Sequence, residues 1–389
     1  MLVYVGTYTG PKARGIYLFR LQADDRPASR NINLIPLGVA AETPNPSFFD
    51  IDVARRRLFA VNELQQVDGR PGGTVTAFSI DRNTGALAMI NQQPSMGAGP
   101  CHIAADNQHR YVVVSNYGSG SVAVLPVHAD GSLGAASAVV QHTGSSINPE
   151  RQKGPHAHCA TFDRANRFVF VCDLGLDRIL VYRFDAARGT LAAHTPAFAP
   201  LKPGAGPRHM AFRPDGRFAY AVNELNSTVT VFAYDASAGV LKEIQTVSTL
   251  PEHFDAPNFP AEIDLHPSGK WLYASNRGHN SVVLFAVDRG TGRLTWVEEQ
   301  GTGGSRPRHF GIDSSGQYLA VGNQDSDTVL VCRVDAGNGR LRPSGVLAEV
   351  PARHRPAQSV DCAPSPLPRD SSVSQRVDGE EADEHICTV

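Results

Sequence analysis

Short segments of alternating apolar and polar residues run through the chain from its first residues to about residue 345. In one well-marked unit, polar turns containing Asp and Gly separate the segments "RHMAF", "RFAYAV" and "STVTVFAY". Period-2 alternation rich in Val, Phe and Tyr, bounded by turn residues, is typical of antiparallel strands. The pattern therefore predicts a protein built from short strands rather than from helices.

This unit repeats along the chain. Similar segments, each opened by a proline, recur roughly every 50 residues, which is the spacing of propeller blades. The opening prolines are Pro100, Pro155, Pro207, Pro260 and Pro307, and a looser unit begins near Pro46. A further turn recurs in five copies, one of which contains Asp235, Gly239 and Leu241. In such a turn the Asp side chain accepts backbone hydrogen bonds and Gly takes a positive φ.

Each unit holds four predicted strands, and six units lie between about residues 40 and 345. The N-terminal segments "LVYVGTY", "GIYLFRL" and "NLIPLGV" predict the last three strands of a seventh unit, whose first strand must come from the C-terminal side. We therefore predict an all-β fold over residues 1–363, a seven-bladed β-propeller of four-stranded antiparallel blades. Radial repetition leaves such a fold few exposed sheet edges. A six-bladed ring is the alternative.

The C-terminal segment departs from the repeat. The segment "AQSVDCA" is only a weak candidate for the strand that closes the ring, and residues 364–389 are mostly Pro, Ser and charged residues. Such a composition buries too little apolar surface to offset the entropy cost of ordering. We expect residues 364–389 to form a disordered tail.

The composition gives no support for a nucleic-acid or membrane partner. The 36 Lys and Arg nearly balance the 38 Asp and Glu, and no basic block gives electrostatic support for a nucleic-acid or membrane-surface partner. The sequence shows no signal-peptide pattern and no apolar stretch of about 18 residues that could span a membrane. The 6 cysteines lack CxxC spacing, as expected of buried free thiols in a reducing compartment. We expect a soluble cytoplasmic protein.

Cations and imidazoles open the predicted inner strands. The innermost strand of a blade lines the channel and its neighbour returns antiparallel, so the start of one and the end of the next share one mouth. "GPRH" opens an inner strand and "NEL" ends its neighbour, which places Arg208 and Glu224 at one mouth. The same geometry adds Arg277, His156 and His158.

Alignment of the units gives two columns of residues at the starts of the inner strands. The first column contains Cys101, His158, Arg208, Ala261 and Arg308, and the second contains His102, Cys159, His209, Glu262 and His309. Several guanidinium groups around a mouth suit a carboxylate or phosphate, because each offers a planar fork that matches their oxygens. Glu224 or His158 would supply proton transfer. Alternatively, Arg208 and Glu224 only pair with each other and hold adjacent blades together.

Other chemistry has weaker support. A metal site could be drawn from His156, His158 and Asp173, but the strand register does not clearly bring them together, and we expect no metal. No GxSxG segment is present, so a serine nucleophile is not indicated. "GTGGS" lacks the Lys and the following helix of a phosphate-binding loop.

Three motifs carry a resemblance to a known family. "GPRHMAFRPDGRFAYAVNELNSTVTVF", "SGKWLYASNRGHNSVVLF" and "NPERQKGPHAH" resemble the seven-bladed lactonase family of cytoplasmic, propeller-type 6-phosphogluconolactonases, over about residues 2–345. That family is similar to the fungal carboxy-muconate lactonizing enzymes, whose site contains a His, an Arg, a Glu and a further Arg. Those residues match His158, Arg208, Glu224 and Arg277, which the resemblance implies are catalytic.

The resemblance implies hydrolysis of the δ-lactone 6-phosphogluconolactone in the oxidative pentose phosphate pathway, with neither a metal nor an organic cofactor. The partner is then a small anionic sugar lactone. Further substrate-binding candidates are His156, His209, Glu262, Arg308 and His309. A muconate-type lactonizing enzyme, another lactonase, and a propeller that serves only as a binding scaffold are the alternatives.

Overall fold

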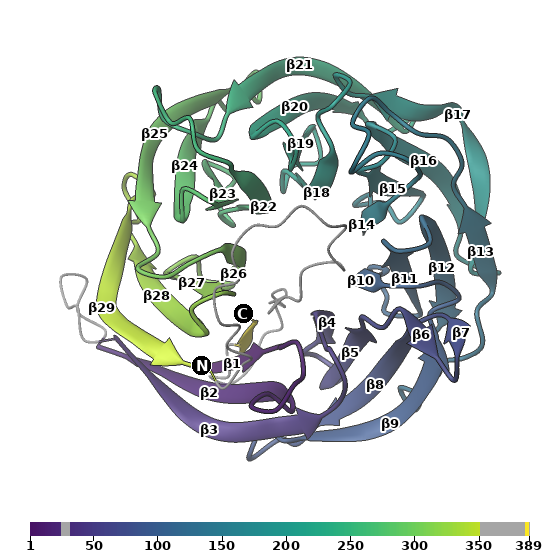
Figure 1. Ribbon diagram of the computed structural model, residues 1–389, viewed down its shortest axis with the longest axis horizontal. Helices are drawn as coiled ribbons and strands as arrows, with labels where there is room; N and C mark the ends of the chain where they lie inside the picture. Colours follow the sequence, from purple (N-terminus) through teal and green to yellow (C-terminus); the bar gives the residue numbers. More distant parts are fainter. Residues whose placement is uncertain (25–31, 351–385, 389) are drawn as a thin grey trace.

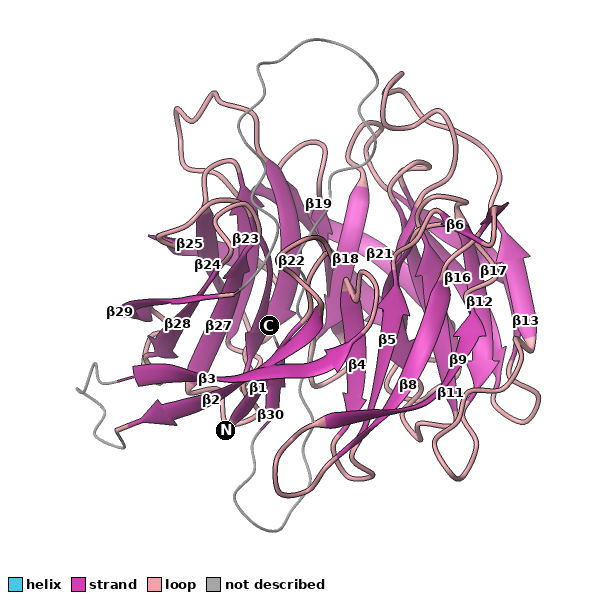
Figure 2. Ribbon diagram, turned by 60° about the horizontal axis from the view of Figure 1, so that its bottom comes forward, coloured by secondary structure: helices cyan, strands magenta, loops and turns pink. Residues whose placement is uncertain are grey.

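Seven four-stranded sheets form a closed ring (Figure 1). The computed structural model describes residues 1–24, 32–350 and 386–388. Within these residues the regular structure consists of strands, and no helix occurs (Figure 2). The predicted seven-bladed β-propeller is confirmed, and the six-bladed alternative is wrong. Among the described residues, no helix has the length and apolar character needed to span a membrane.

Six blades follow the predicted order, from an inner strand beside the central axis to an outer strand at the rim, and all their strand pairs are antiparallel. The first three of these blades contain β4 (Phe48–Asp52), β5 (Arg57–Asn62), β8 (Thr74–Ile80) and β9 (Leu87–Pro94); β10 (Pro100–Ala105), β11 (Tyr111–Asn116), β12 (Ser121–Pro126) and β13 (Ala138–Gln141); and β14 (Ala157–Phe162), β15 (Phe168–Asp173), β16 (Arg178–Asp185) and β17 (Thr190–Pro200). A small hairpin of β6 (Gln66–Val67) and β7 (Arg70–Pro71) lies between β5 and β8.

The next three blades complete this series. They contain β18 (Pro207–Phe212), β19 (Phe218–Asn223), β20 (Thr228–Asp235) and β21 (Val240–Ser248); β22 (Phe259–Leu265), β23 (Trp271–Arg277), β24 (Ser281–Val287) and β25 (Leu294–Gly301); and β26 (Pro307–Ile312), β27 (Tyr318–Asn323), β28 (Thr328–Val334) and β29 (Leu341–Glu349). The recurring turn has the expected chemistry, because the Asp235 side chain accepts two backbone hydrogen bonds and Gly239 has a φ of 67°.

The seventh blade joins the two ends of the chain. It contains β3 (Ile32–Glu42), β2 (Gly15–Ala23), β1 (Leu2–Val5) and β30 (Ile386–Thr388), in that order. β30 pairs with β1 in a parallel direction, so this blade is not wholly antiparallel.

The ring therefore closes with a C-terminal strand, as predicted, but at a different place. β30 lies inside the segment that we expected to be a disordered tail, because "ICT" is a short apolar stretch that the average composition of the tail conceals. The "AQSVDCA" segment and the rest of residues 364–385 lie outside the described residues.

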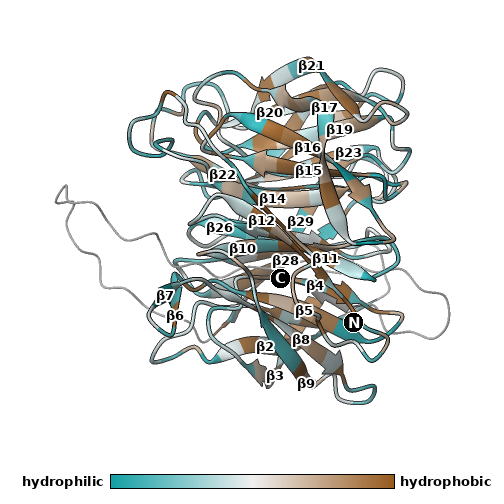
Figure 3. Ribbon diagram, turned by 90° about the vertical axis from the view of Figure 1, so that its right-hand side faces the viewer, coloured by the Kyte–Doolittle hydropathy of each residue, from teal (hydrophilic) through white to brown (hydrophobic). Residues whose placement is uncertain are grey.

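Apolar side chains fill the interfaces between neighbouring blades. In one interface Val222 and Val231 pack with Ile263 and Phe285 of the next blade, and all four are at least 97% buried. Figure 3 shows hydrophobic residues concentrated on the strands and hydrophilic residues in the loops. This packing fixes the inner strands as a rigid frame around the channel.

A β-bulge recurs near the start of the inner strands. In β10, Pro100 pairs with Asn116 and His102 pairs with Ser115, so Cys101 is the extra residue. The same shift in register occurs in β14, β18 and β26, where the extra residues are His158, Arg208 and Arg308. A bulge redirects a side chain. Four residues of the first column in the sequence alignment, Cys101, His158, Arg208 and Arg308, therefore occupy the same bulge position in their blades.

Candidate active site

A polar pocket lies where inner strands begin and their neighbours end. The space between its lining residues, including the part that is open to solvent, is about 390 Å³. The lining residues are Glu63, Cys101, Tyr117, Arg151, His158, Glu224, Arg277 and Arg308. Three of the four residues predicted to be catalytic line this pocket, and the fourth, Arg208, contacts one of them.

Glu224 directly follows β19, and three guanidinium groups surround its carboxylate. Arg277 Nη2 donates to Oε2 at 2.8 Å and Arg151 Nη2 donates to Oε1 at 2.7 Å. Arg208 Nε forms an ion pair with Oε2 at 3.4 Å. Burial opposes ionisation of Glu224, but the charges of Arg277, Arg151 and Arg208 hold the pKa of its carboxyl well below the usual range. Such a carboxylate is a weak base, because its oxygens already accept hydrogen bonds from cations.

The buried arginines are anchored to the backbone as well as to Glu224. Arg208 Nη1 donates to the carbonyl of Ala261 in the next blade at 2.7 Å, and Arg277 Nε donates to the carbonyl of Phe259 at 2.9 Å. Burial and the nearby charge of Arg308 lower the pKa of Arg208 to about 10, which still leaves it protonated at neutral pH. Arg208 and Glu224 do pair, but within one blade, and it is the Arg277–Glu224 pair that joins two adjacent blades.

Arg151 is a member of this site that the sequence analysis did not select. It lies in the loop "NPERQKGPHAH", where Asn148 Oδ1 accepts hydrogen bonds from the backbone N–H groups of Glu150 and Arg151, both at 3.0 Å. Gln152 fastens the same loop to the carbonyl of Leu174. The fold of this loop brings Arg151 to Glu224, 73 residues away along the chain. The loop motif is recognisable in the sequence, but the sequence does not show that the Arg151 side chain points toward Glu224.

Glu63 is the second unpredicted member. It follows β5 as Glu224 follows β19, and the shared "NEL" at the two places is the signal that could have identified it. The Tyr8 hydroxyl donates to Glu63 Oε2 at 2.5 Å. Burial raises the pKa of Glu63, although the nearby Arg308 opposes that shift. The two carboxyls of the pocket are therefore tuned in opposite directions.

His158 lines the pocket as a buried imidazole. Its ring packs edge-on against Tyr117, with centroids 5.4 Å apart, and Nδ1 lies 3.7 Å from the Cys101 sulfur. Burial and the charge of Arg208 lower the pKa of His158 well below its usual value. The ring is thus neutral at physiological pH and can accept a proton. His156 instead stacks on Tyr117 at 4.4 Å, outside the set of lining residues.

The second column of the alignment lies deeper, along the central channel. His209, Glu262 and His309 line a cavity together with His102 and Cys159 rather than the mouth pocket. The bulge accounts for this division, since it turns the first-column side chains to the mouth and leaves the next residue facing the channel. Among the predicted substrate-binding residues, Arg308 lies at the mouth, and His209, Glu262 and His309 do not.

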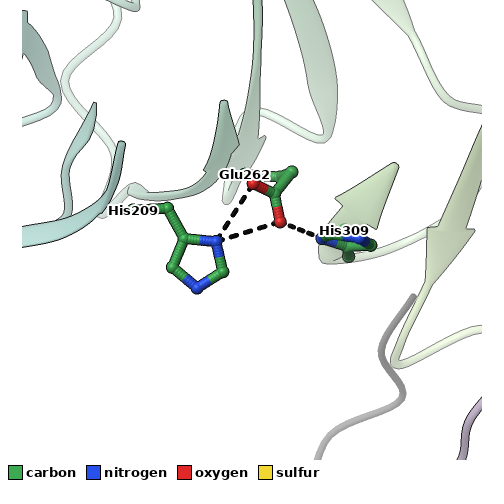
Figure 4. A group of neighbouring side chains, drawn as sticks. All are labelled: His209, Glu262 and His309. Carbon is green, nitrogen blue, oxygen red and sulfur yellow. Dashed lines mark hydrogen bonds and ion pairs between the residues drawn. The ribbon is translucent and has the colours of Figure 1, made fainter. Parts of the chain in front are cut away.

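The metal ligands considered from the sequence do not come together. Asp173 Oδ2 pairs with His142 Nδ1 at 2.6 Å, and Oδ1 accepts hydrogen bonds from the backbone N–H groups of His156 and Gly175. The trio of His156, His158 and Asp173 therefore does not form a ligand set. In the part of the chain that the structure describes, the side chains with suitable spacing are His209, Glu262 and His309 (Figure 4).

Comparison with known proteins gives a consistent family. The family model described as "Lactonase, 7-bladed beta-propeller" matches residues 2–355. The 6-phosphogluconolactonase of Bacillus subtilis is 36% identical over 311 residues, which cover 80% of this chain and 84% of that protein. A 6-phosphogluconolactonase of Formosa agariphila is 33% identical over 315 residues, covering 80% and 86% of the two chains.

A solved structure extends the comparison to three dimensions. The periplasmic gluconolactonase of Pseudomonas aeruginosa is 36% identical to this chain and superposes with a TM-score of 0.83, covering 91% of this chain and 98% of its own. The family match spans nearly the whole propeller, including every strand that contributes to the mouth pocket. This chain therefore belongs to the seven-bladed β-propeller lactonase family.

Proposed function

We propose that the mouth pocket binds and hydrolyses 6-phosphogluconolactone, giving 6-phosphogluconate in the oxidative pentose phosphate pathway. The observation that carries this proposal is the excess of positive charge in the pocket. Arg151, Arg277 and Arg308 line it and Arg208 contacts Glu224 beside it, whereas of the two carboxyls that line the pocket only Glu224 has a lowered pKa. A phosphate dianion suits such a surplus of guanidinium groups.

The names of two relatives support the same substrate. The proteins of Bacillus subtilis and Formosa agariphila are both named 6-phosphogluconolactonase. The Pseudomonas aeruginosa protein is named a periplasmic gluconolactonase, which favours an unphosphorylated sugar lactone as the second candidate. We propose a cytoplasmic location for this chain, because a phosphorylated sugar lactone is an intracellular metabolite.

Hydrolysis begins with attack of water on the lactone carbonyl. His158 is the better base at this site, because its ring lines the pocket with Nδ1 beside the Cys101 sulfur rather than an arginine, whereas the oxygens of Glu224 are held by arginines. His158 takes the proton of the attacking water, and the carbonyl oxygen becomes an oxyanion. Guanidinium groups of the pocket stabilise that oxyanion more than the uncharged carbonyl from which it forms.

Ring opening completes the reaction. The tetrahedral intermediate collapses, the bond from the carbonyl carbon to the ring oxygen breaks, and the leaving oxygen needs a proton. Glu63 supplies it, because burial raises the pKa of its carboxyl and so favours the protonated form. The proton on His158 then passes through solvent to restore Glu63. Glu224 serves as a positioning residue that holds Arg277 and Arg151 in place.

The decisive assay compares three substrates at matched concentrations. 6-Phosphogluconolactone, unphosphorylated gluconolactone and a carboxymuconate are each followed against the rate in buffer. We expect the phosphorylated lactone to have the highest kcat/KM. A preference for gluconolactone would support the second candidate. Turnover of the carboxymuconate would indicate a lactonizing enzyme. Rates equal to the buffer rate for all three substrates would indicate a binding scaffold.

A further inference from the structure

The channel below the mouth pocket contains a second group of potential ligands. His209, Glu262 and His309 come from β18, β22 and β26, the inner strands of three consecutive blades. One donor atom from each of the three lies within 4.8 Å of the others (Figure 4). The three residues are between 95% and 97% buried. None of them has a place in the hydrolysis derived above.

Both imidazoles converge on the same carboxylate. His209 Nδ1 lies 3.0 Å from each oxygen of Glu262, and His309 Nδ1 contacts Oε2 of the same group (Figure 4). Two atoms that each bind one ion at about 2.1 Å lie about 3.0–3.4 Å apart at octahedral or tetrahedral angles. The separation of His209 and Glu262 already falls in this range.

Two features show that hydrogen bonding leaves this group incompletely satisfied. The Nε2 atoms of His209 and His309 are buried without a hydrogen-bond partner. The ion pairs of Glu262 are made with these two histidines rather than with an arginine or lysine. A buried carboxylate is costly unless a cation compensates its charge. A metal ion bound beside Glu262 would supply that charge and would take the lone pair of the Nδ1 atom that each imidazole turns toward the carboxylate.

We propose that His209, Glu262 and His309 bind a divalent first-row transition-metal ion in the central channel. Two imidazoles and one carboxylate on one side of an ion form a ligand set that suits zinc, iron(II) or cobalt(II) and leaves positions open for water. The three residues line a cavity that His102 and Phe48 also line, which gives such waters room. Because the ligands belong to three blades, the ion ties those blades together at the channel.

Metal content and Co²⁺ spectroscopy test this proposal on the full-length protein. We expect purified protein to contain about one equivalent of metal, or to take up one equivalent of Zn²⁺ tightly after treatment with a chelator. Co²⁺ should give visible d–d bands that saturate at one equivalent, with an increase in the melting temperature. If the untreated and the reconstituted wild-type protein both lack a stoichiometric site, the proposal is wrong.

Two substitutions and a control locate the ion. His309→Gln and Glu262→Gln should each weaken Zn²⁺ binding by more than about 100-fold. His128→Ala, which removes an exposed imidazole from a turn outside the group, should leave the affinity unchanged. Circular dichroism checks that each variant is folded. Unchanged Zn²⁺ affinity in a folded His309→Gln or Glu262→Gln protein would place the ion elsewhere and overturn the assignment. Since the readouts are binding and spectra, they do not depend on the proposed hydrolysis.

Discussion

Replacing Glu224 by Gln separates two roles that this residue could have. The substitution preserves the shape of the side chain but removes the negative charge that three arginines share. In addition, the amide presents N–H donors where Arg277 and Arg151 now donate to carboxylate oxygens. A base at this position, the hypothesis that the sequence allows, would lose proton transfer. A positioning residue would lose the geometry of the arginines.

The structure sets the expected loss of stability. The side chains of Arg277 and Arg208 are 4% and 2% exposed, so water cannot replace the lost charge, whereas the Arg151 side chain is 35% exposed and is largely compensated. Removal of one partner from a buried ion pair typically costs about 3–5 kcal/mol. We expect the free energy of unfolding of Glu224→Gln to fall by about that amount, mainly because of the two buried arginines.

The pH dependence of this loss follows from the depressed pKa of Glu224. A carboxyl with a lowered pKa in the folded state stabilises the protein above its ordinary pKa of about 4.5, and this contribution disappears as the pH falls through the folded value. The stability difference between the wild type and Glu224→Gln should therefore be constant near neutral pH and shrink below about pH 4.5. Urea unfolding at several pH values measures it.

Kinetics then distinguish the two roles. As a positioning residue, Glu224 should affect both kcat and KM for 6-phosphogluconolactone, with kcat/KM falling by about 10²–10³, and the acidic limb of the pH–rate profile should remain. If Glu224 is the base, kcat falls while KM is nearly unchanged, and the acidic limb is lost. Retention of full activity in a merely less stable protein would refute both roles and leave Glu224 as a link between blades.

Four further predictions follow from the same pocket and from the closing strand. Arg277→Ala should reduce kcat/KM for the phosphorylated lactone at least about 10-fold more than for gluconolactone, because only the former has a phosphate to lose; equal losses would remove Arg277 from phosphate binding. Glu63→Gln should lower kcat by about 10²–10³ and abolish the decline in rate at high pH, since the proton donor is gone. In the wild type, the rate should rise with increasing pH as His158 loses its proton, and the midpoint of this rise should lie below the ordinary histidine pKa because the pKa of His158 is lowered. His158→Gln should abolish this rise; a rise that survives the substitution assigns the base elsewhere. Deletion of residues 386–389 removes the partner of β1 and should lower the melting temperature, whereas an unchanged value would mean that β30 does not stabilise the ring.

The repeat explains why so much of the mouth could be predicted from the sequence. Once the units are aligned, the position of a residue within its unit fixes its place in a blade, and Arg208 and Glu224 meet as expected. The alignment could not reveal which column faces the mouth. That choice depends on the bulge, which adds a residue such as Arg208 to an inner strand, and no local propensity marks it in the sequence. His209 was therefore assigned to the substrate although it faces the channel.

Residues outside the strands were harder to predict for a different reason. Arg151 reaches Glu224 from a loop whose fold depends on side-chain contacts of Asn148 and Gln152 with the backbone. Tyr8 meets Glu63 only because the blade that contains β1 packs beside the blade that contains β5. Contacts of this kind depend on the finished tertiary structure, and the period of the sequence does not encode them.

Under the proposed mechanism, the opposite tuning of the two carboxyls would link substrate binding to catalysis. Ionised Glu224 offsets one guanidinium charge and keeps the arginines ordered, whereas the raised pKa of Glu63 favours the form that adds no negative charge beside the phosphate. Deprotonation of Glu63 would therefore weaken the pocket twice, because it removes the proton needed by the leaving oxygen and adds a negative charge beside Arg308. Binding of a phosphate dianion favours the ionised form of neighbouring cations and the protonated form of neighbouring acids. The substrate itself would thus raise the pKa of Glu63 further, in the direction that the proposed role as an acid requires.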